Sequence, residues 1–469
     1  MARRSALAIL VTSLAIGGCA LESPPKPDEI RQQSLPNLTL PQAWAARAGL
    51  STPVADDWIH SFNDPALDGF VTEALLYNAD LMVAAARVEQ AAGYAKAAGA
   101  LIYPSVNLMA RGGGKMGGDG SGINGLGVFA NWELDLWGRV RSERAAGDYA
   151  YQAAVADAEF ARQSIAAMVA KSWILAIEAK LQRQLAEEIS TAAQGATTIA
   201  RDRLRVGIGD DYDVALAEST YESTRDAVRQ LALAEDQALR ALEALVGRYP
   251  SATLLVRTTL PALPSEVPVG LPSELLERRP DVIAAERRVA AAFHRVGEAK
   301  AARLPKIALT ASVSSVSSSL FVLQNHANPV WSIGATLLQP IFNGFALEAN
   351  VEIRTAEQKI AVAEYGRIGA RAFGDVENAL SSEFAALERE AILSRAVDVN
   401  VRGLDLAKVR FRVGSGDLRG VLQQGATLGA SRSTRLRMAS EQLIQRINLH
   451  LALGGSFEAR PAPAVAGGT

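Results

Sequence analysis

Apolar residues recur at three- and four-residue steps along two long stretches of this chain that contain no proline. In the first, residues 140–203, the recurrence includes Ile165, Val169 and Trp173, and this period predicts a single helix of roughly 60 residues. The second stretch, residues 345–412, has the same period. Shorter helices are predicted over residues 68–99, 211–245, 273–303 and 418–453. Alanine is frequent on their apolar sides, which lets neighbouring backbones approach closely, and a soluble helical bundle would show the same pattern.

Four other segments alternate between apolar and polar residues, and each is predicted as a strand. They cover residues 103–112, 126–136, 305–315 and 329–342. Alternation over roughly nine residues is typical of a membrane-spanning strand with a lipid face and a polar inner face. A half-buried sheet in a soluble protein alternates in the same way. Aromatic residues lie near the predicted strand ends, where a membrane interface is expected: Tyr103, Trp132, Trp137 and Trp331.

Four strands are too few to close a barrel. Lipid does not tolerate open sheet edges, because unpaired backbone groups find no water there. A membrane-spanning form must therefore be an oligomer. Barrels of eight or more strands with an even number are known, so a dimer and a trimer both satisfy closure, and the strand pattern does not choose between them.

The chain is internally duplicated. The hexapeptide at residues 205–210 (RVGIGD) returns at residues 412–417 (RVGSGD), an offset of 412 − 205 = 207. Further upstream Asp80 corresponds to Asp281, an offset of 281 − 80 = 201. The sequence therefore predicts two structural repeats, residues 68–260 and 261–454, each too long for a solenoid unit.

The N-terminus predicts export and lipid attachment. Arg3 and Arg4 precede an apolar run, and Cys19 follows Ile-Gly-Gly, so residues 1–18 are predicted as a signal peptide and Cys19 as a lipidated residue. Cys19 is the only cysteine, which excludes an intrachain disulfide. Residues 19–67 are predicted as a lipidated tether, extended over the proline-rich part at 20–43. The tail, residues 455–469, is predicted as disordered. Ala20 follows the cysteine, and by resemblance to lipoprotein sorting rules this predicts the outer membrane.

Charge and motifs exclude several function classes. The net charge is −2, with 48 basic and 50 acidic residues, so no basic field for nucleic acid is present. After the signal peptide no apolar run reaches the ~20 residues of a membrane-spanning helix. The four histidines are scattered without metal-ligand spacing, and the Gly-rich run before Lys115 lacks the Ser or Thr of a phosphate loop. We therefore predict no enzyme activity, no metal and no cofactor.

Several segments, in order, resemble one family. They are residues 58–67 (WIHSFNDPAL), 131–139 (NWELDLWGR), 272–282 (PSELLERRPDV) and 339–344 (QPIFNG). They are similar to the outer-membrane factor (TolC-like) lipoproteins of tripartite efflux systems, and the resemblance extends from about residue 16 to 455. Residues 136–138 (Leu-Trp-Gly) end at Gly138, and the corresponding residues 342–344 of the second repeat (Phe-Asn-Gly) end at Gly344; both are predicted as corners between a strand and a helix. In the family such corners lead from strand into helix.

The resemblance implies a homotrimer and a fold that is mainly α with a β-barrel portion. Three copies would form a twelve-stranded β-barrel in the outer membrane, continuous with a long α-helical barrel in the periplasm. The implied function is a passive exit duct for small molecules such as drugs and toxic compounds. The implied partners are outer-membrane lipid, a periplasmic adaptor and an inner-membrane transporter of the RND type. The alternative is a structural periplasmic lipoprotein or stalk without a pore, and the four alternating strands favour the channel.

In the family, the two repeated turns form the periplasmic tip where the tunnel closes. We therefore predict a gate held by ion pairs and hydrogen bonds between neighbouring helix pairs. The candidates are Arg205, Asp210, Asp211, Asp213, Arg412, Asp417 and Arg419. For any single one of them, a role in capping or solvation is the simpler interpretation, because an exposed ion pair contributes only about 0–1 kcal/mol. Many relatives have an acidic ring after the second turn, but the aligned positions here are Gly420 and Gln423. Neither the exported substrate nor the resting state of the gate follows from the sequence.

Overall fold

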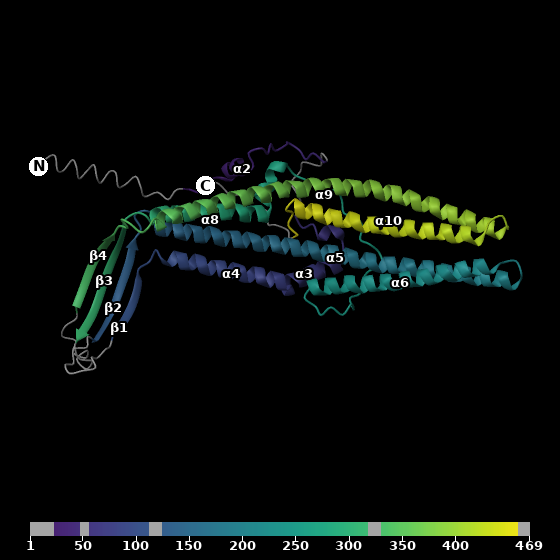
Figure 1. The fold of residues 1–469 in the computed structure, drawn as a ribbon, viewed down its shortest axis with the longest axis horizontal. Helices are drawn as coiled ribbons and strands as arrows, with labels where there is room; N and C mark the ends of the chain where they lie inside the picture. Colours follow the sequence, from purple (N-terminus) through teal and green to yellow (C-terminus); the bar gives the residue numbers. More distant parts are fainter. Residues whose placement is uncertain (1–22, 47–55, 112–123, 318–329, 458–469) are drawn as a thin grey trace, which may run out of the picture. The chain divides into compact units, whose positions relative to one another are not determined.

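A computed structural model of the chain describes residues 23–46, 56–111, 124–317 and 330–457 (Figure 1). The predicted signal peptide and the lipid attachment site Cys19 lie outside the described residues, as do residues 112–123 and 318–329 between the paired strands. The predicted tail also lies outside them from residue 458 onward.

The four long predicted helices are confirmed almost to the residue. Helices α5 (Arg139–Arg205) and α9 (Ala346–Arg412) have 67 residues each, and α6 (Asp211–Leu245) and α10 (Leu418–Ala452) have 35 each. Corresponding helices of the two repeats are therefore equal in length, as a duplication predicts.

The prediction of one continuous helix over residues 68–99 is wrong. The structure has α3 (Pro65–Tyr77) and α4 (Ala79–Ala100), with Asn78 between them in an extended conformation. The side-chain oxygen of Asn78 accepts hydrogen bonds from two N–H groups at the start of α4, at 2.9 and 3.2 Å. Its amide donates to the carbonyl of Leu245 at 2.8 Å. A side chain that caps the next helix in this way competes with continuation of the previous one.

The predicted helix over residues 273–303 is also interrupted. A 3-10 turn (Pro272–Glu274) and the single turn α7 (Leu275–Arg278) precede α8 (Pro280–Ala301). Arg279 has an extended backbone, because the ring of a following proline disfavours the helical conformation.

Two segments, residues 27–34 and 455–457, differ from the prediction. The segment predicted as an extended tether contains α2 (Pro27–Ser34), whose Ile30 is buried. Proline is compatible with the first turn of a helix, where its missing N–H is not needed, so the proline-rich composition was misleading. At the other end, Phe457 is 5% exposed, which corrects the predicted disorder for the first residues after 454.

The four strands form one antiparallel sheet in the order β1-β2-β3-β4 (Figure 1). They are β1 (Ser105–Arg111), β2 (Asn124–Leu134), β3 (Lys306–Ser317) and β4 (Val330–Leu338). Strands β1 and β2 belong to the first repeat and β3 and β4 to the second, so the β2–β3 pairing joins the repeats. Strands β1 and β4 each pair on one side only within the described residues.

The pairing register places most of the apolar residues of the four strands on one face. One row consists of Val106, Ala130, Ala311 and Ile333, and the next of Leu108, Val128, Val313 and Trp331. A row on the opposite face consists of Ser105, Asn131, Thr310 and Gly334. The alternation seen in the sequence thus becomes one apolar and one largely polar face. Among the helices in the described part of the chain, none is long and apolar enough to cross a bilayer.

The chain divides into two compact units, and neither coincides with a repeat. The first, called the sheet unit here, comprises residues 1–38, 85–157 and 281–369. The second, the core unit, comprises residues 39–84, 158–280 and 370–469. Each unit takes segments from both halves of the chain, so the repeats predicted from sequence are not separate compact domains.

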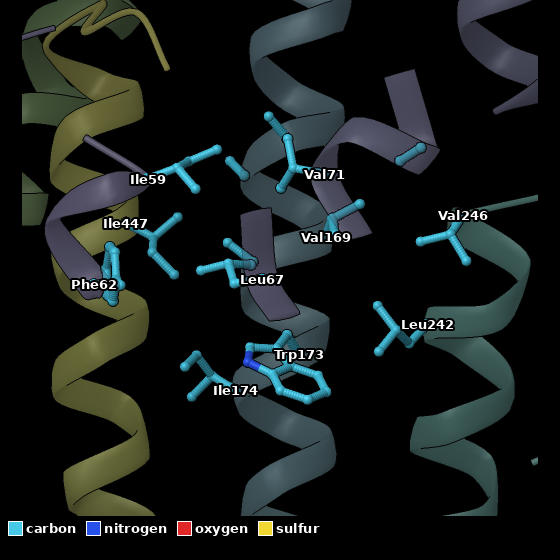
Figure 2. Close-up of a cluster of buried hydrophobic side chains, with 14 of the residues drawn as sticks. Ile59, Phe62, Leu67, Val71, Val169, Trp173, Ile174, Leu242, Val246 and Ile447 are labelled. Atoms are coloured by element: carbon cyan, nitrogen blue, oxygen red, sulfur yellow. The ribbon is translucent and has the colours of Figure 1, made fainter. Parts of the chain in front are cut away.

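A large hydrophobic cluster lies in the core unit (Figure 2). Trp173 of α5 lies close to Leu67 of α3 in this cluster, and Leu242 of α6 belongs to the same cluster. The indole N–H of Trp173 donates to the buried carboxylate of Asp64 at 2.9 Å. Asp64 also forms an ion pair with Arg257 at 3.0 Å. The segment that precedes α3 is therefore anchored to the centre of this unit.

Candidate functional site

The two repeated turns have the same geometry. Gly207 and Gly414 have φ angles of 75° and 77°, a left-handed conformation that glycine adopts without strain and that commonly ends a helix. In the first turn the N–H of Ile208 donates to the carbonyl of Arg203 at 3.0 Å. The equivalent bond in the second turn is 2.9 Å long. Both turns are therefore closed by the backbone itself.

Two of the predicted gate residues cap the helices that follow the turns. The carboxylate of Asp210 accepts a hydrogen bond from the N–H of Asp213 at 2.8 Å. The carboxylate of Asp417 accepts one from the N–H of Gly420, also at 2.8 Å. An aspartate at this position satisfies an otherwise unpaired N–H and interacts favourably with the helix dipole. For Asp210 and Asp417 the capping interpretation is thus observed within the chain.

The two helical hairpins that carry these turns contact each other in the core unit. The guanidinium of Arg419 lies 5.0 Å from the ring centroid of Tyr212, and that of Arg203 lies 4.8 Å from the ring of Phe411. A small buried cluster of Ala200, Ala217 and Leu418 includes residues of both hairpins, and Phe411 packs against it. Cation–π contacts of this kind contribute about 0.5–1 kcal/mol at exposed sites.

Among the described residues, the remaining gate candidates form no ion pair that joins the two hairpins. Arg205 pairs with Asp202 of its own helix at 2.8 Å, and both side chains are exposed. In the part of the chain that the structure describes, Asp211 and Arg412 form no ion pair. Within the first hairpin, an ion pair joins Arg201 of α5 to Glu218 of α6 at 2.7 Å. A contribution of the candidates to contacts between copies of the chain stays a prediction.

Sequence reasoning missed the cation–π contacts, although a signal for one of them was present. Tyr212 and Arg419 occupy equivalent positions of the repeats, since 419 − 212 = 207. An aromatic residue and an arginine at equivalent positions can meet where two repeats pack about a local twofold relation. The contact of Arg203 with Phe411 has no such signal.

The first strand-to-helix corner is held by a dense polar network in the sheet unit. Gly138 has a φ of 76°, and the neighbouring Trp137 donates its indole N–H to the carbonyl of Pro305 at 2.8 Å. The carboxylate of Asp135 accepts hydrogen bonds from two N–H groups at the start of α5, at 3.1 and 2.9 Å. Arg139 binds Glu133 at 2.8 and 2.9 Å, which raises the pKa of its guanidinium.

The second corner has fewer polar contacts among the described residues: the amide of Gln339 donates to the carbonyl of Arg303 at 3.1 Å, and Arg303 pairs with Glu348 at 3.4 Å. Gly344 and Phe345 have φ angles of 66° and 65°, and Ile341, Phe342 and Phe345 are all highly exposed. The predicted corner residues Gly138 and Gly344 therefore have similar backbones but different surroundings. Within the described ranges, no group of three or more His, Cys, Asp or Glu residues could hold a metal ion.

The chain resembles known outer-membrane proteins over nearly its full length. The family model described as Outer membrane efflux protein matches residues 70–248 and 271–455. The starts of these matches differ by 271 − 70 = 201 and the ends by 455 − 248 = 207, the offsets that relate the two repeats.

Individual relatives cover almost the whole chain. The pyoverdine export outer membrane protein OpmQ of Pseudomonas aeruginosa is 30% identical over 473 residues, covering 96% of this chain and 97% of OpmQ. The cation efflux system protein CusC of Escherichia coli is 29% identical over 460 residues, covering 95% and 97%. The solved structure of the outer-membrane channel OprN has a TM-score of 0.83 and 26% identity, covering 89% of this chain and 97% of that one.

Proposed function

The chain belongs to the outer membrane efflux protein family, and we propose that it forms the gated exit duct of a tripartite pump. In this proposal an RND-type inner-membrane transporter supplies the energy and the cargo, and a periplasmic adaptor links transporter to duct. The relatives differ in the cargo that their names give, pyoverdine for OpmQ and cations for CusC. A duct shared among such different cargoes is consistent with cargo selection by the transporter.

The main support for a trimeric duct is the four-stranded sheet. It has one continuous apolar face, and its two edge strands, β1 and β4, are each unpaired on one side within the described residues. In a bilayer such edges must pair with further strands, because lipid offers no hydrogen bonds. Edge β4 of one copy can pair with edge β1 of the next, and three copies give twelve strands with every backbone group paired.

A trimeric pore and a stalk without a pore predict different behaviour. The pore predicts trimers in outer-membrane fractions that resist detergent and dissociate on heating, and discrete conductance steps in planar bilayers. A stalk predicts neither. A full-length preparation that stays monomeric and never conducts would overturn the proposal. Incorporation of labelled palmitate, lost in Cys19→Ala, tests the lipid anchor separately.

We propose that the gate lies at the two repeated turns and that these turns form the periplasmic tip of the duct. Exposed pairs are individually weak, about 0–1 kcal/mol each, so a closed state held by several of them is readily reversed by an adaptor that binds the open state better. Arg412→Ala and Asp417→Ala should raise single-channel conductance. Conductance equal to that of the parent in both variants would reject these two assignments.

A further inference from the structure

A cavity of about 360 Å³ lies at the second corner, where β4 ends and α9 begins. Lys300, in the last turn of α8, and Arg303, just after this helix, contribute its basic groups, and Glu348 contributes its carboxylate. The other lining residues include Gln339, Asn343, Ile341, Phe342 and Phe345. All of them belong to the sheet unit.

The apolar part of this lining is unusually open to solvent in the single chain. Ile341 is 91% exposed, Phe342 79% and Phe345 71%. The two phenylalanine rings meet edge to face, with centroids 5.9 Å apart. Full burial of such a side chain is favourable by about 1.5–3 kcal/mol. Three exposed apolar side chains directly after a strand with an apolar face therefore indicate that an apolar molecule or surface covers them.

The polar part of the lining carries an excess positive charge. Arg303 pairs with Glu348 at 3.4 Å, whereas Lys300 forms no ion pair within the described ranges. At the first corner, by contrast, Arg139 and Arg141 both have carboxylate partners. The second corner therefore has one uncompensated cation beside three exposed apolar side chains.

We propose that this cavity binds the headgroup of an anionic phospholipid. The phosphate would lie against Lys300 and Arg303, and the acyl chains over Ile341 and Phe342. The inference rests on the proposed function, which places this end of the strands at the periplasmic surface of the outer membrane. Basic residues beside an apolar surface at a membrane interface have the chemistry that recognises such lipids.

A neighbouring copy of the chain is the competing occupant, because β4 is an edge strand. Pairing of β4 with β1 of the next copy would bring residues 99–105 toward this corner. That segment contains no Asp or Glu, so it brings no carboxylate to pair with Lys300. A phospholipid supplies both the anion and the apolar cover.

The test uses native mass spectrometry of the full-length protein in detergent, titrated with phosphatidylglycerol or phosphatidylcholine. The parent should retain phosphatidylglycerol preferentially, and excess inorganic phosphate should not displace it. Lys300→Gln should weaken phosphatidylglycerol binding by about fivefold, since a cation near a membrane surface contributes about 1 kcal/mol. Lys96→Gln is the matched control, because Lys96 is an exposed lysine near the end of α4 in the same unit and does not line the cavity.

Two results would overturn the inference. One is equal binding of both lipids, or equal phosphatidylglycerol binding by the Lys300→Gln and Lys96→Gln variants. The other is a Phe342→Ala variant that dissociates the trimer in lipid-free detergent but binds phosphatidylglycerol normally, which would assign the cavity to a contact between copies. Conductance measured on the same preparations keeps the proposals separate: normal conductance without lipid preference removes only the lipid site.

Discussion

Glu243 is a buried carboxylate on α6 that holds the loop after this helix. It accepts hydrogen bonds from the N–H groups of Ala252, Thr253 and Leu254 at 2.7, 2.8 and 3.3 Å. Burial raises the pKa of Glu243, but these backbone hydrogen bonds outweigh burial and lower it below 4.5. A depressed pKa means that the carboxylate stabilises the fold above its unfolded-state pKa, and that this stability is lost as the pH falls through the folded pKa.

Replacement of Glu243 by Gln should therefore lower the free energy of unfolding by about 1–3 kcal/mol at neutral pH, because backbone donors lose their charged acceptor. Thermal unfolding of the full chain measures this, with the exposed Glu188 of α5 changed to Gln as control. The difference from the parent should shrink as the pH falls below 4.5. Equal melting temperatures of the two variants at pH 7 would contradict the role of Glu243.

His450 of α10 is a second buried titratable residue of the core unit. Its ring stacks on Trp58, with centroids 5.5 Å apart and an interplanar angle of 14°. Its Nδ1 atom has no hydrogen-bond partner among the described residues. Burial, and then the neighbouring charge of Arg446, lower the pKa of His450 to about 3. Arg446 itself is compensated by the carboxylate of Glu383.

Acid should therefore destabilise the core unit through His450. The unfolded chain binds a proton near pH 6.5 and the folded chain only near 3, so stability is complete above pH 6.5 and falls between these values. His450→Phe keeps a stacked ring and removes this proton site. It should melt like the parent at pH 8 and be more stable by about 2 kcal/mol at pH 5. The same loss of melting temperature on acidification in both proteins would contradict this account.

At the scale of elements, the sequence predicts helices and strands that follow from local patterns, and it misses helix breaks that depend on contacts with distant residues. The long helices follow from a period visible in the chain itself. The break at Asn78 depends partly on the carbonyl of Leu245, 167 residues away. The break at Arg279 could be predicted from the sequence, because Pro280 follows it. The burial of Ile30 and Phe457 could not be predicted, because the apolar residues around them do not recur at a helical or strand period.

The candidate site shows the same division. The glycines and capping aspartates of the two turns follow from the repeated hexapeptide. That Arg419 contacts Tyr212 requires the two hairpins to lie against each other, which the chain's local pattern does not specify. The asymmetry between the corners likewise arises because the end of α8 and the residues after it bring Lys300 and Arg303 to the second corner.

The Tyr212–Arg419 contact gives a prediction for the gate. Tyr212→Ala and Arg419→Ala should each loosen the packing of the two hairpins and raise the open fraction in planar bilayers. Because one contact is removed in both cases, the double variant should open no more than either single variant. Tyr221→Ala is the control, since the ring of Tyr221 contacts Arg225 of the same helix at 5.7 Å. Additive effects of the two substitutions would show that the contact does not couple the hairpins.

At the scale of the whole molecule, duplication explains why a chain with so few strands can contribute to a closed wall. Each repeat supplies one hairpin, and the β2–β3 pairing joins the hairpins into a single sheet with the apolar rows in register. Long helices of equal length then follow both hairpins. The compact units cut across the repeats, so neither repeat is expected to fold as an independent domain.

Neighbouring residues of β4 test whether the apolar face meets lipid. Ile333 lies in the apolar row with Ala311, whereas Ser332 pairs with Ser312 on the opposite face. A lysine in the middle of a lipid-facing strand costs about 2–4 kcal/mol, and a trimer carries that cost in every copy. Ile333→Lys should therefore abolish heat-dissociable trimers in outer-membrane fractions, and Ser332→Lys should retain them and alter only ion selectivity. Because both variants add the same charge to adjacent positions, equal trimer yields would mean that the apolar face does not lie against the bilayer.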